Sequence, residues 1–93
     1  MESIVVTRHN ALIEYLEELG VVPDGTSVVA HATEEDVCGK HVYGVLSMRL
    51  AAKAAMLTEV SMTIPVEWRG VELTLEQIKA CKPELFTYRI NLL

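Results

Sequence analysis

The chain has 93 residues, of which 51% are hydrophobic and 23% are charged, and its formal net charge is −5. This length and this balance indicate a single globular domain over residues 1–93 and exclude a disordered chain. The negative charge argues against binding to a long nucleic-acid duplex, whereas a compact anionic ligand needs only a few well-placed arginines.

The first third of the chain predicts a strand, a helix and a second strand. A β-branched run at residues 4–7 predicts the first strand, and Asn10 is expected to cap the helix after it. Gly20 ends this helix, and the second strand is expected at residues 27–32. The face of the helix that we expect to be buried carries Leu12, Tyr15, Leu16 and Leu19.

The remaining elements alternate between strand and helix. Thr33 is expected to begin a single helical turn, Ser47 to cap an Ala-rich helix over residues 48–57, and Thr74 to form a capping box with Gln77. The Ala-rich helix is apolar almost all round, so we expect it to be buried on more than one side. Further strands are expected at residues 41–46, 60–64 and 86–92.

This alternation predicts an α/β sandwich of three layers around a five-stranded, mostly parallel sheet. The connection from the second strand to the third is too short for a full helix, and the last strand is a candidate for antiparallel pairing.

Two cysteines, Cys38 and Cys81, make no disulfide framework and have no metal-ligand spacing, so we expect neither a metal nor a cofactor. The sequence has no leader pattern, and its apolar runs are far shorter than the roughly 18 residues of a membrane span. We therefore expect a cytoplasmic protein with no membrane partner. The small size and the high apolar content together favour a homodimer.

Basic and hydrogen-bonding side chains gather where predicted strands end. Thr7-Arg8-His9-Asn10 follows the first strand, Ser47-Met48-Arg49 follows the third, and Arg69 lies beyond the fourth. In open α/β sheets, ligands bind at the carboxyl ends of the strands, and helix N-termini there favour anions. These residues therefore predict a phosphate-binding edge.

Each of these side chains also has a plainer interpretation. Arg8 is compatible with a solvated surface position, and Asn10 and Ser47 with simple capping roles. His9 stands beside Arg8 at a strand end and is a candidate acid or base, whereas His31 and His41 are interpreted as structural. The glycines form no dinucleotide-binding or ATP-binding pattern.

Three spaced motifs run through nearly the whole chain. They are Thr7-Arg8-His9 with Ala11, Gly44-x-Leu46-x-x-x-Leu50-Ala51-Ala52, and Pro65-x-x-x-Arg69-Gly70-x-x-Leu73. In these motifs the chain resembles the small Csx-type accessory proteins encoded beside type III CRISPR systems, a family of ring nucleases. Relatives often carry proline where Ser47 stands, and this departure bears on any role for that residue.

The resemblance implies a Rossmann-like homodimer that binds cyclic oligoadenylate, with the four-membered ring as the expected ligand, and cleaves it without metal. On this interpretation Arg8 and Arg49 hold phosphate, Asn10 and Ser47 donate hydrogen bonds, and His9 is the acid/base residue. Thr7 and Arg69 complete the expected binding set, and Arg8 is also counted with His9 as catalytic. Two alternatives stay open: a buffer that binds the ring without cutting it, and a structural or interaction subunit.

Overall fold

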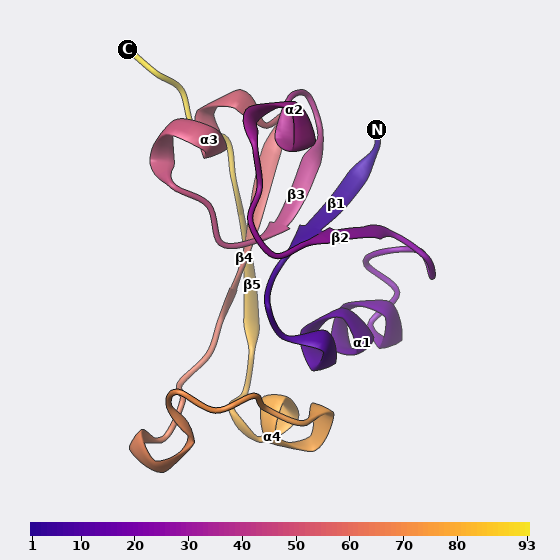
Figure 1. The fold of residues 1–93 in the computed structure, drawn as a ribbon, viewed down its shortest axis with the longest axis vertical. Coiled ribbons are helices and arrows are strands. Elements are labelled where there is room, and N and C mark those ends of the chain that lie inside the picture. The colour runs from indigo at the N-terminus through magenta and orange to yellow at the C-terminus, as the bar shows by residue number, and fades with distance from the viewer.

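The computed structural model describes residues 1–93 and contains one five-stranded sheet with strand order β2-β1-β3-β4-β5 (Figure 1). The first four strands run parallel, and β5 pairs antiparallel with β4. The predicted α/β fold and mostly parallel sheet are therefore confirmed, including the antiparallel last strand. The strands are β1 (Ser3–Val6), β2 (Ser27–Val29), β3 (His41–Gly44), β4 (Met56–Ser61) and β5 (Glu84–Tyr88).

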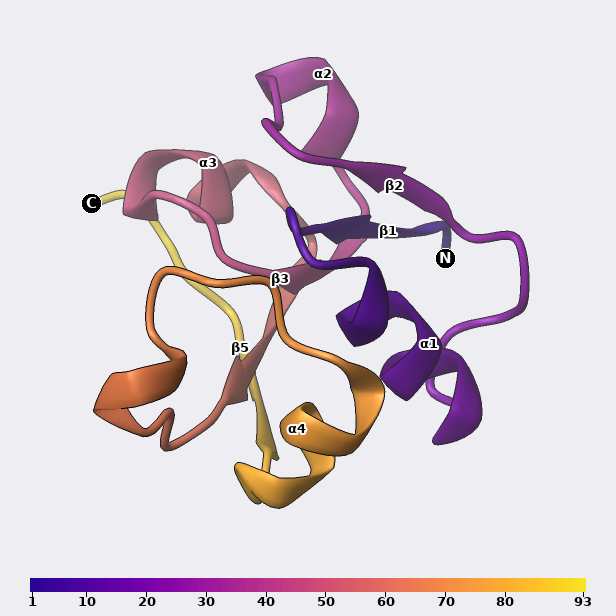
Figure 2. The same ribbon diagram turned by 60° about the horizontal axis from the view of Figure 1, so that its bottom comes forward.

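Helices cover both faces of this sheet, which gives the expected three layers (Figure 2). The helices α1 and α4 contact each other on one face, and α2 and α3 contact each other on the other. None of these helices has the length and hydropathy that a bilayer crossing requires. The helical elements are α1 (Asn10–Glu18), α2 (Glu34–Val37), α3 (Met48–Lys53), α4 (Leu75–Ala80) and the 3-10 turn η1 (Val66–Trp68).

The central strand β1 is apolar on both faces because it lies between two hydrophobic clusters. Its Val5 packs with Leu16 and Ile78 in the cluster under α1 and α4. Its Ile4 and Val6 pack in the opposite cluster. Successive side chains of a strand point to opposite faces, so a short run of β-branched residues contributes to both cores.

Three of the helices have an N-cap side chain that accepts a hydrogen bond from the first turn. Ser47 Oγ accepts a hydrogen bond from Leu50 N, as predicted, and Thr74 forms the predicted capping box with Gln77. Thr33 begins the expected short turn α2. The prediction that Asn10 caps α1 is wrong, because Asn10 is the first helical residue and His9 occupies the cap position without a side-chain cap bond.

The Ala-rich helix is shorter and more exposed than predicted. It ends at Lys53, and residues 56–57 belong to β4 instead, where Leu57 pairs with Val42 and is buried. Strand pairing and burial thus override the helix propensity of the alanines. Only Ala51 of this helix is buried and Met48 is 75% exposed, so one chain by itself does not provide the expected burial on several sides.

Other boundaries differ by a few residues. The strand predicted at 60–64 begins earlier, at Met56, and β2, β3 and β5 end earlier than predicted. Leu19 is 48% exposed because the helix ends before it and the chain turns at Gly20, which has a φ of 76°. Val22 is buried in the core instead.

Gly44 ends β3 at the point where this strand meets β1. Its φ is 135°, and an added Cβ would lie 2.0 Å from the backbone oxygen of Val6. Val6 is its register partner in the parallel pair. Only glycine therefore allows these two strand ends to approach this closely.

We expect Gly44→Ala to destabilise the fold by at least about 2 kcal/mol, because backbone strain and a clash with the chain of β1 act together. Gly25→Ala is the matched control. Gly25 has a φ of 83° but open space around its Cβ position, so only the conformational cost of about 1 to 2 kcal/mol applies. Urea unfolding of both variants measures the difference, and equal losses would contradict the role of the β1–β3 contact.

Candidate functional site

A groove lies at the carboxyl edge of the parallel strands, around the turn from β1 into α1. It consists of two adjoining depressions of about 630 and 490 Å³, volumes typical of small-molecule sites. The sequence predicts ligand binding at this edge of the sheet. The side chains that line both depressions are Arg8, His9, Leu12, Met62 and Ile64.

The β1–α1 turn positions Arg8 and His9. Thr7 N donates to Val29 O at 3.0 Å, which ties the turn to β2, and Thr7 Oγ1 accepts from His9 N at 3.1 Å. The Thr7 hydroxyl therefore has an intramolecular partner in the turn itself. Arg8 and His9 are both exposed, so their side chains are open to a ligand.

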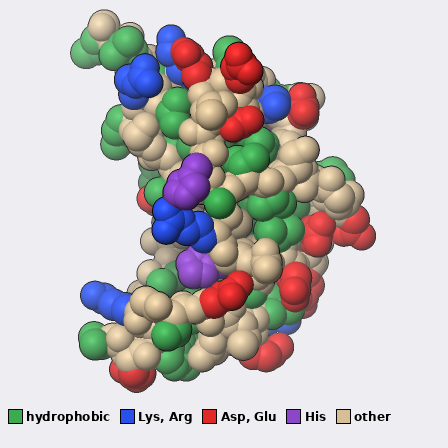
Figure 3. All heavy atoms as spheres, in the orientation of Figure 1, with side chains coloured by type: hydrophobic (Ala, Val, Ile, Leu, Met, Phe, Trp, Pro, Cys, Tyr) green, Lys and Arg blue, Asp and Glu red, His purple; other side chains and the backbone are tan.

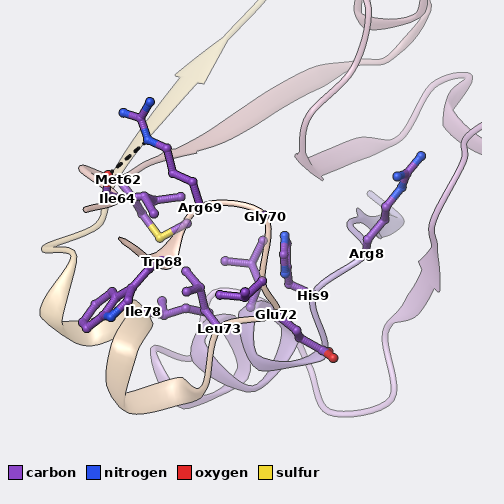
Figure 4. Close-up of a pocket in the computed structure, with 12 residues that line it drawn as sticks. Arg8, His9, Met62, Ile64, Trp68, Arg69, Gly70, Glu72, Leu73 and Ile78 are labelled. Atoms are coloured by element: carbon purple, nitrogen blue, oxygen red, sulfur yellow. Dashed lines mark hydrogen bonds between the residues drawn. The ribbon is translucent and has the colours of Figure 1, made fainter. Parts of the chain in front are cut away.

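Arg69 reaches the same groove from the segment after β4. Its Nε donates to Ile64 O at 3.4 Å. In the close-up, His9 lies between Arg8 and Arg69, and the three side chains project toward the same side, whereas Trp68 and Glu72 point away from His9 (Figure 4). Two cationic side chains thus lie on either side of His9, and their guanidinium groups are directed outward from its ring.

His31 also lines this groove, although its sequence context predicts a structural role. Its Nε2 lies 3.3 Å from Arg8 Nη2, and its side chain lines the same depression as His9. The predicted strand 27–32 actually ends at Val29, so residues 30 and 31 leave the sheet at its carboxyl edge. The sequence signal that indicates this contact is the parallel pairing of β1 with β2. Arg8 and His31 each follow the end of one of these strands by two residues, so they lie at the same edge.

Three predicted site residues lie elsewhere or have other partners. Ser47 Oγ accepts the capping bond from Leu50 N at 3.3 Å. Arg49 lines a separate depression with Lys53 and the C-terminal segment. Asn10 is exposed in the first turn of α1 and lines neither depression of the groove.

Local charge in the groove is opposite to the net charge of the chain. Arg8 and Arg69 are the cations of the lining, Glu72 is its one carboxylate, and the first turn of α1 contains no acidic residue. The positive end of the α1 dipole is thus not compensated there. Figure 3 shows histidine and basic side chains gathered in the middle of one face. This arrangement favours a phosphate or another compact anion.

The third histidine, His41, lies outside the groove in the sheet. Its Nε2 is 2.6 Å from Thr58 Oγ1, which lies 2.8 Å from Thr87 Oγ1, and its ring stacks on Tyr43 with centroids 4.3 Å apart. Desolvation lowers the pKa of His41 and raises that of Tyr43. No cluster of three or more His, Cys, Asp or Glu side chains has a metal-binding arrangement.

We expect the fold to lose stability as the pH falls below about 6.5, the ordinary pKa of histidine, in part through His41. Burial depresses the pKa of His41 in the folded state, so the unfolded chain takes up the proton first. The stabilising contribution is present above the unfolded pKa and is lost as the pH falls through the folded one. Urea unfolding of wild type and His41→Gln should show a smaller loss in the variant, and parallel losses would contradict this origin.

Comparison with protein families gives a match over most of the chain. The model of the family described as "Putative CRISPR-associated protein (Cas_VVA1548)" matches residues 4–91. No curated protein and no solved structure shows significant similarity to the chain.

Proposed function

Because the chain belongs to this family of CRISPR-associated proteins, we propose that it is a ring nuclease that binds cyclic oligoadenylate and cleaves it to linear products. One observation carries the proposal: two arginines flank a histidine in an open groove at the carboxyl edge of a parallel sheet. The groove thus combines cations suited to phosphate with an imidazole, a side chain that can donate or accept a proton.

The groove is also suited to the other parts of a nucleotide. Apolar side chains from α1 and the segment after β4 make up much of its lining. Adenine bases stack on such surfaces, whereas the phosphates between them favour Arg8 and Arg69. In the proposal, the ring therefore lies with its phosphates over the two arginines.

The proposed cleavage uses the nucleophile that RNA itself contains. The 2′-hydroxyl attacks the adjacent phosphorus, the 5′-oxygen leaves, and the product ends in a 2′,3′-cyclic phosphate. Arg8 and Arg69 would neutralise the phosphate, and His9 would transfer a proton. Switching off the signal carried by the ring would be the biological result.

The proposal includes a homodimer, since a ring of identical nucleotides has rotational symmetry that a two-fold pair of grooves can match. Two side chains beside the groove support it. Val45 is 78% exposed and Met48 is 75% exposed, although both are apolar and lie at the carboxyl end of β3. A second copy packed on this edge would cover them and bring two grooves together.

One experiment distinguishes the proposal from its alternatives. Labelled cyclic tetra-adenylate is incubated with purified protein and a chelator, and the products are separated. Linear products support the nuclease, an intact retained ring supports a buffer, and no interaction supports a structural subunit.

We expect Arg8→Ala and Arg69→Ala to weaken binding of cyclic tetra-adenylate by roughly 10- to 100-fold, because each loses a charge-assisted contact to phosphate. We expect His9→Ala to slow single-turnover cleavage by about 100-fold or more while binding is retained. Arg89→Ala is the control, since Arg89 is exposed and lines none of the depressions around Arg8. An equal effect of Arg89→Ala would show that net charge alone explains the losses.

We expect light scattering to give about twice the chain mass for the wild type and the mass of one chain for Val45→Glu, because a buried carboxylate opposes association. Val66→Glu is the matched control. Val66 is equally exposed, at 78%, but lies in η1. A dimer that survives Val45→Glu would place the interface on another face.

A further inference from the structure

His31 and His9 reach the groove from the ends of different strands. Arg8 lies next to both, because it contacts His31 and directly precedes His9 in the sequence. His31 follows β2 and contacts the Arg8 guanidinium at 3.3 Å, whereas His9 follows Arg8 directly at the start of α1. All three residues are exposed and line one depression. Figure 3 shows histidine side chains next to basic ones on this face.

The contact with Arg8 orients the ring of His31. A guanidinium can only donate, so in this contact His31 Nε2 accepts with its lone pair. The titratable side chains that line this depression are Arg8, His9 and His31, and no carboxylate is among them. His31 therefore directs the lone pair of Nε2 at the phosphate-binding arginine.

We propose that His31 is the general base of the cleavage reaction and that His9 is the general acid. This inference rests on the proposed function and assigns the second proton transfer that the reaction requires. As the O2′–P bond forms, His31 Nε2 takes the proton of the 2′-hydroxyl. As the P–O5′ bond breaks, the His9 imidazolium gives its proton to O5′. The products are a 2′,3′-cyclic phosphate and a free 5′-hydroxyl, and exchange of protons with solvent restores both imidazoles.

Arg8 couples ligand binding to this step. Its bond to a neutral imidazole is weaker than a bidentate, charge-assisted contact with phosphate. An arriving phosphate therefore draws the guanidinium away from His31. The lone pair of Nε2 becomes free when a 2′-hydroxyl is present to use it.

The test compares His31→Gln with His31→Ala in the full-length protein. A glutamine oxygen can accept the Arg8 N–H as Nε2 does, but it cannot take up a proton. Both variants should slow single-turnover cleavage of cyclic tetra-adenylate by about 100-fold or more and leave equilibrium binding within a few-fold of wild type. A normal rate in His31→Gln with a slow His31→Ala would overturn the proposal, because His31 would then only position Arg8.

The pH profile separates the two histidines. Wild type should show a bell-shaped dependence of rate on pH, since the base must be neutral and the acid protonated. His31→Gln should lose the limb that rises from acidic pH, and His9→Gln the limb that falls at alkaline pH. Loss of the alkaline limb in His31→Gln would overturn the assignment of base and acid.

A ring with sulfur in place of the bridging 5′-oxygen identifies the acid independently. A thiolate leaves without protonation, so this substrate should restore cleavage by His9→Gln and not by His31→Gln. Rescue of His31→Gln would contradict its role as base. His41→Gln is the matched control, a histidine outside the groove, and should cleave like the wild type.

These measurements distinguish failure of the proposed nuclease function from failure of the role assigned to His31. A wild-type protein that leaves the ring intact overturns the nuclease function itself. A wild type that cleaves, together with a fully active His31→Gln, overturns only the role of His31.

Discussion

The close parallel pairing of β1 with β3, which ends at Val6 and Gly44, is the contact on which the site depends. Any side chain at Gly44 would collide with the backbone of Val6, so the two strands can end side by side only with glycine there. This contact sets where β1 stops and where the Thr7-Arg8-His9 turn begins. Because β2 pairs with the other side of β1, the carboxyl ends of β1, β2 and β3 lie side by side at one edge of the sheet.

Placement at that edge explains how an acidic chain can favour an anion. The glutamates of α1 lie along the helix beyond its first turn, and the groove receives Arg8 from one segment and Arg69 from another. Coulomb interactions weaken with distance and are screened within about 10 Å in salt, so a phosphate in the groove interacts mainly with the nearest charges. The local arrangement therefore matters more than the net charge of −5.

The sequence predicted most of the fold because its signals were local. Threonine and serine caps, glycine turns and β-branched runs gave the order of elements, the parallel sheet and the edge that carries Arg8 and His9. The errors arose where tertiary contacts decided the outcome. Residues 54–57 favour helix by composition, but the helix ends at Lys53 and residues 56–57 join β4, where Leu57 pairs with Val42. Arg49 follows a strand end, yet its side chain lies in a different depression, because α3 turns toward the C-terminal segment. No local sequence pattern indicates the direction in which α3 packs.

The three histidines show how position along a strand decides the chemistry available to a side chain. His41 begins β3, at the amino end, where Thr58 holds its ring and desolvation lowers its pKa. His9 and His31 follow the carboxyl ends of β1 and β2, where the rings are exposed. The same imidazole thus joins a side-chain hydrogen-bond network at one edge and is accessible for proton transfer at the other. Since β1 and β2 are parallel neighbours, the second accessible histidine follows from the topology: a residue two positions beyond β2 lies within reach of one two positions beyond β1.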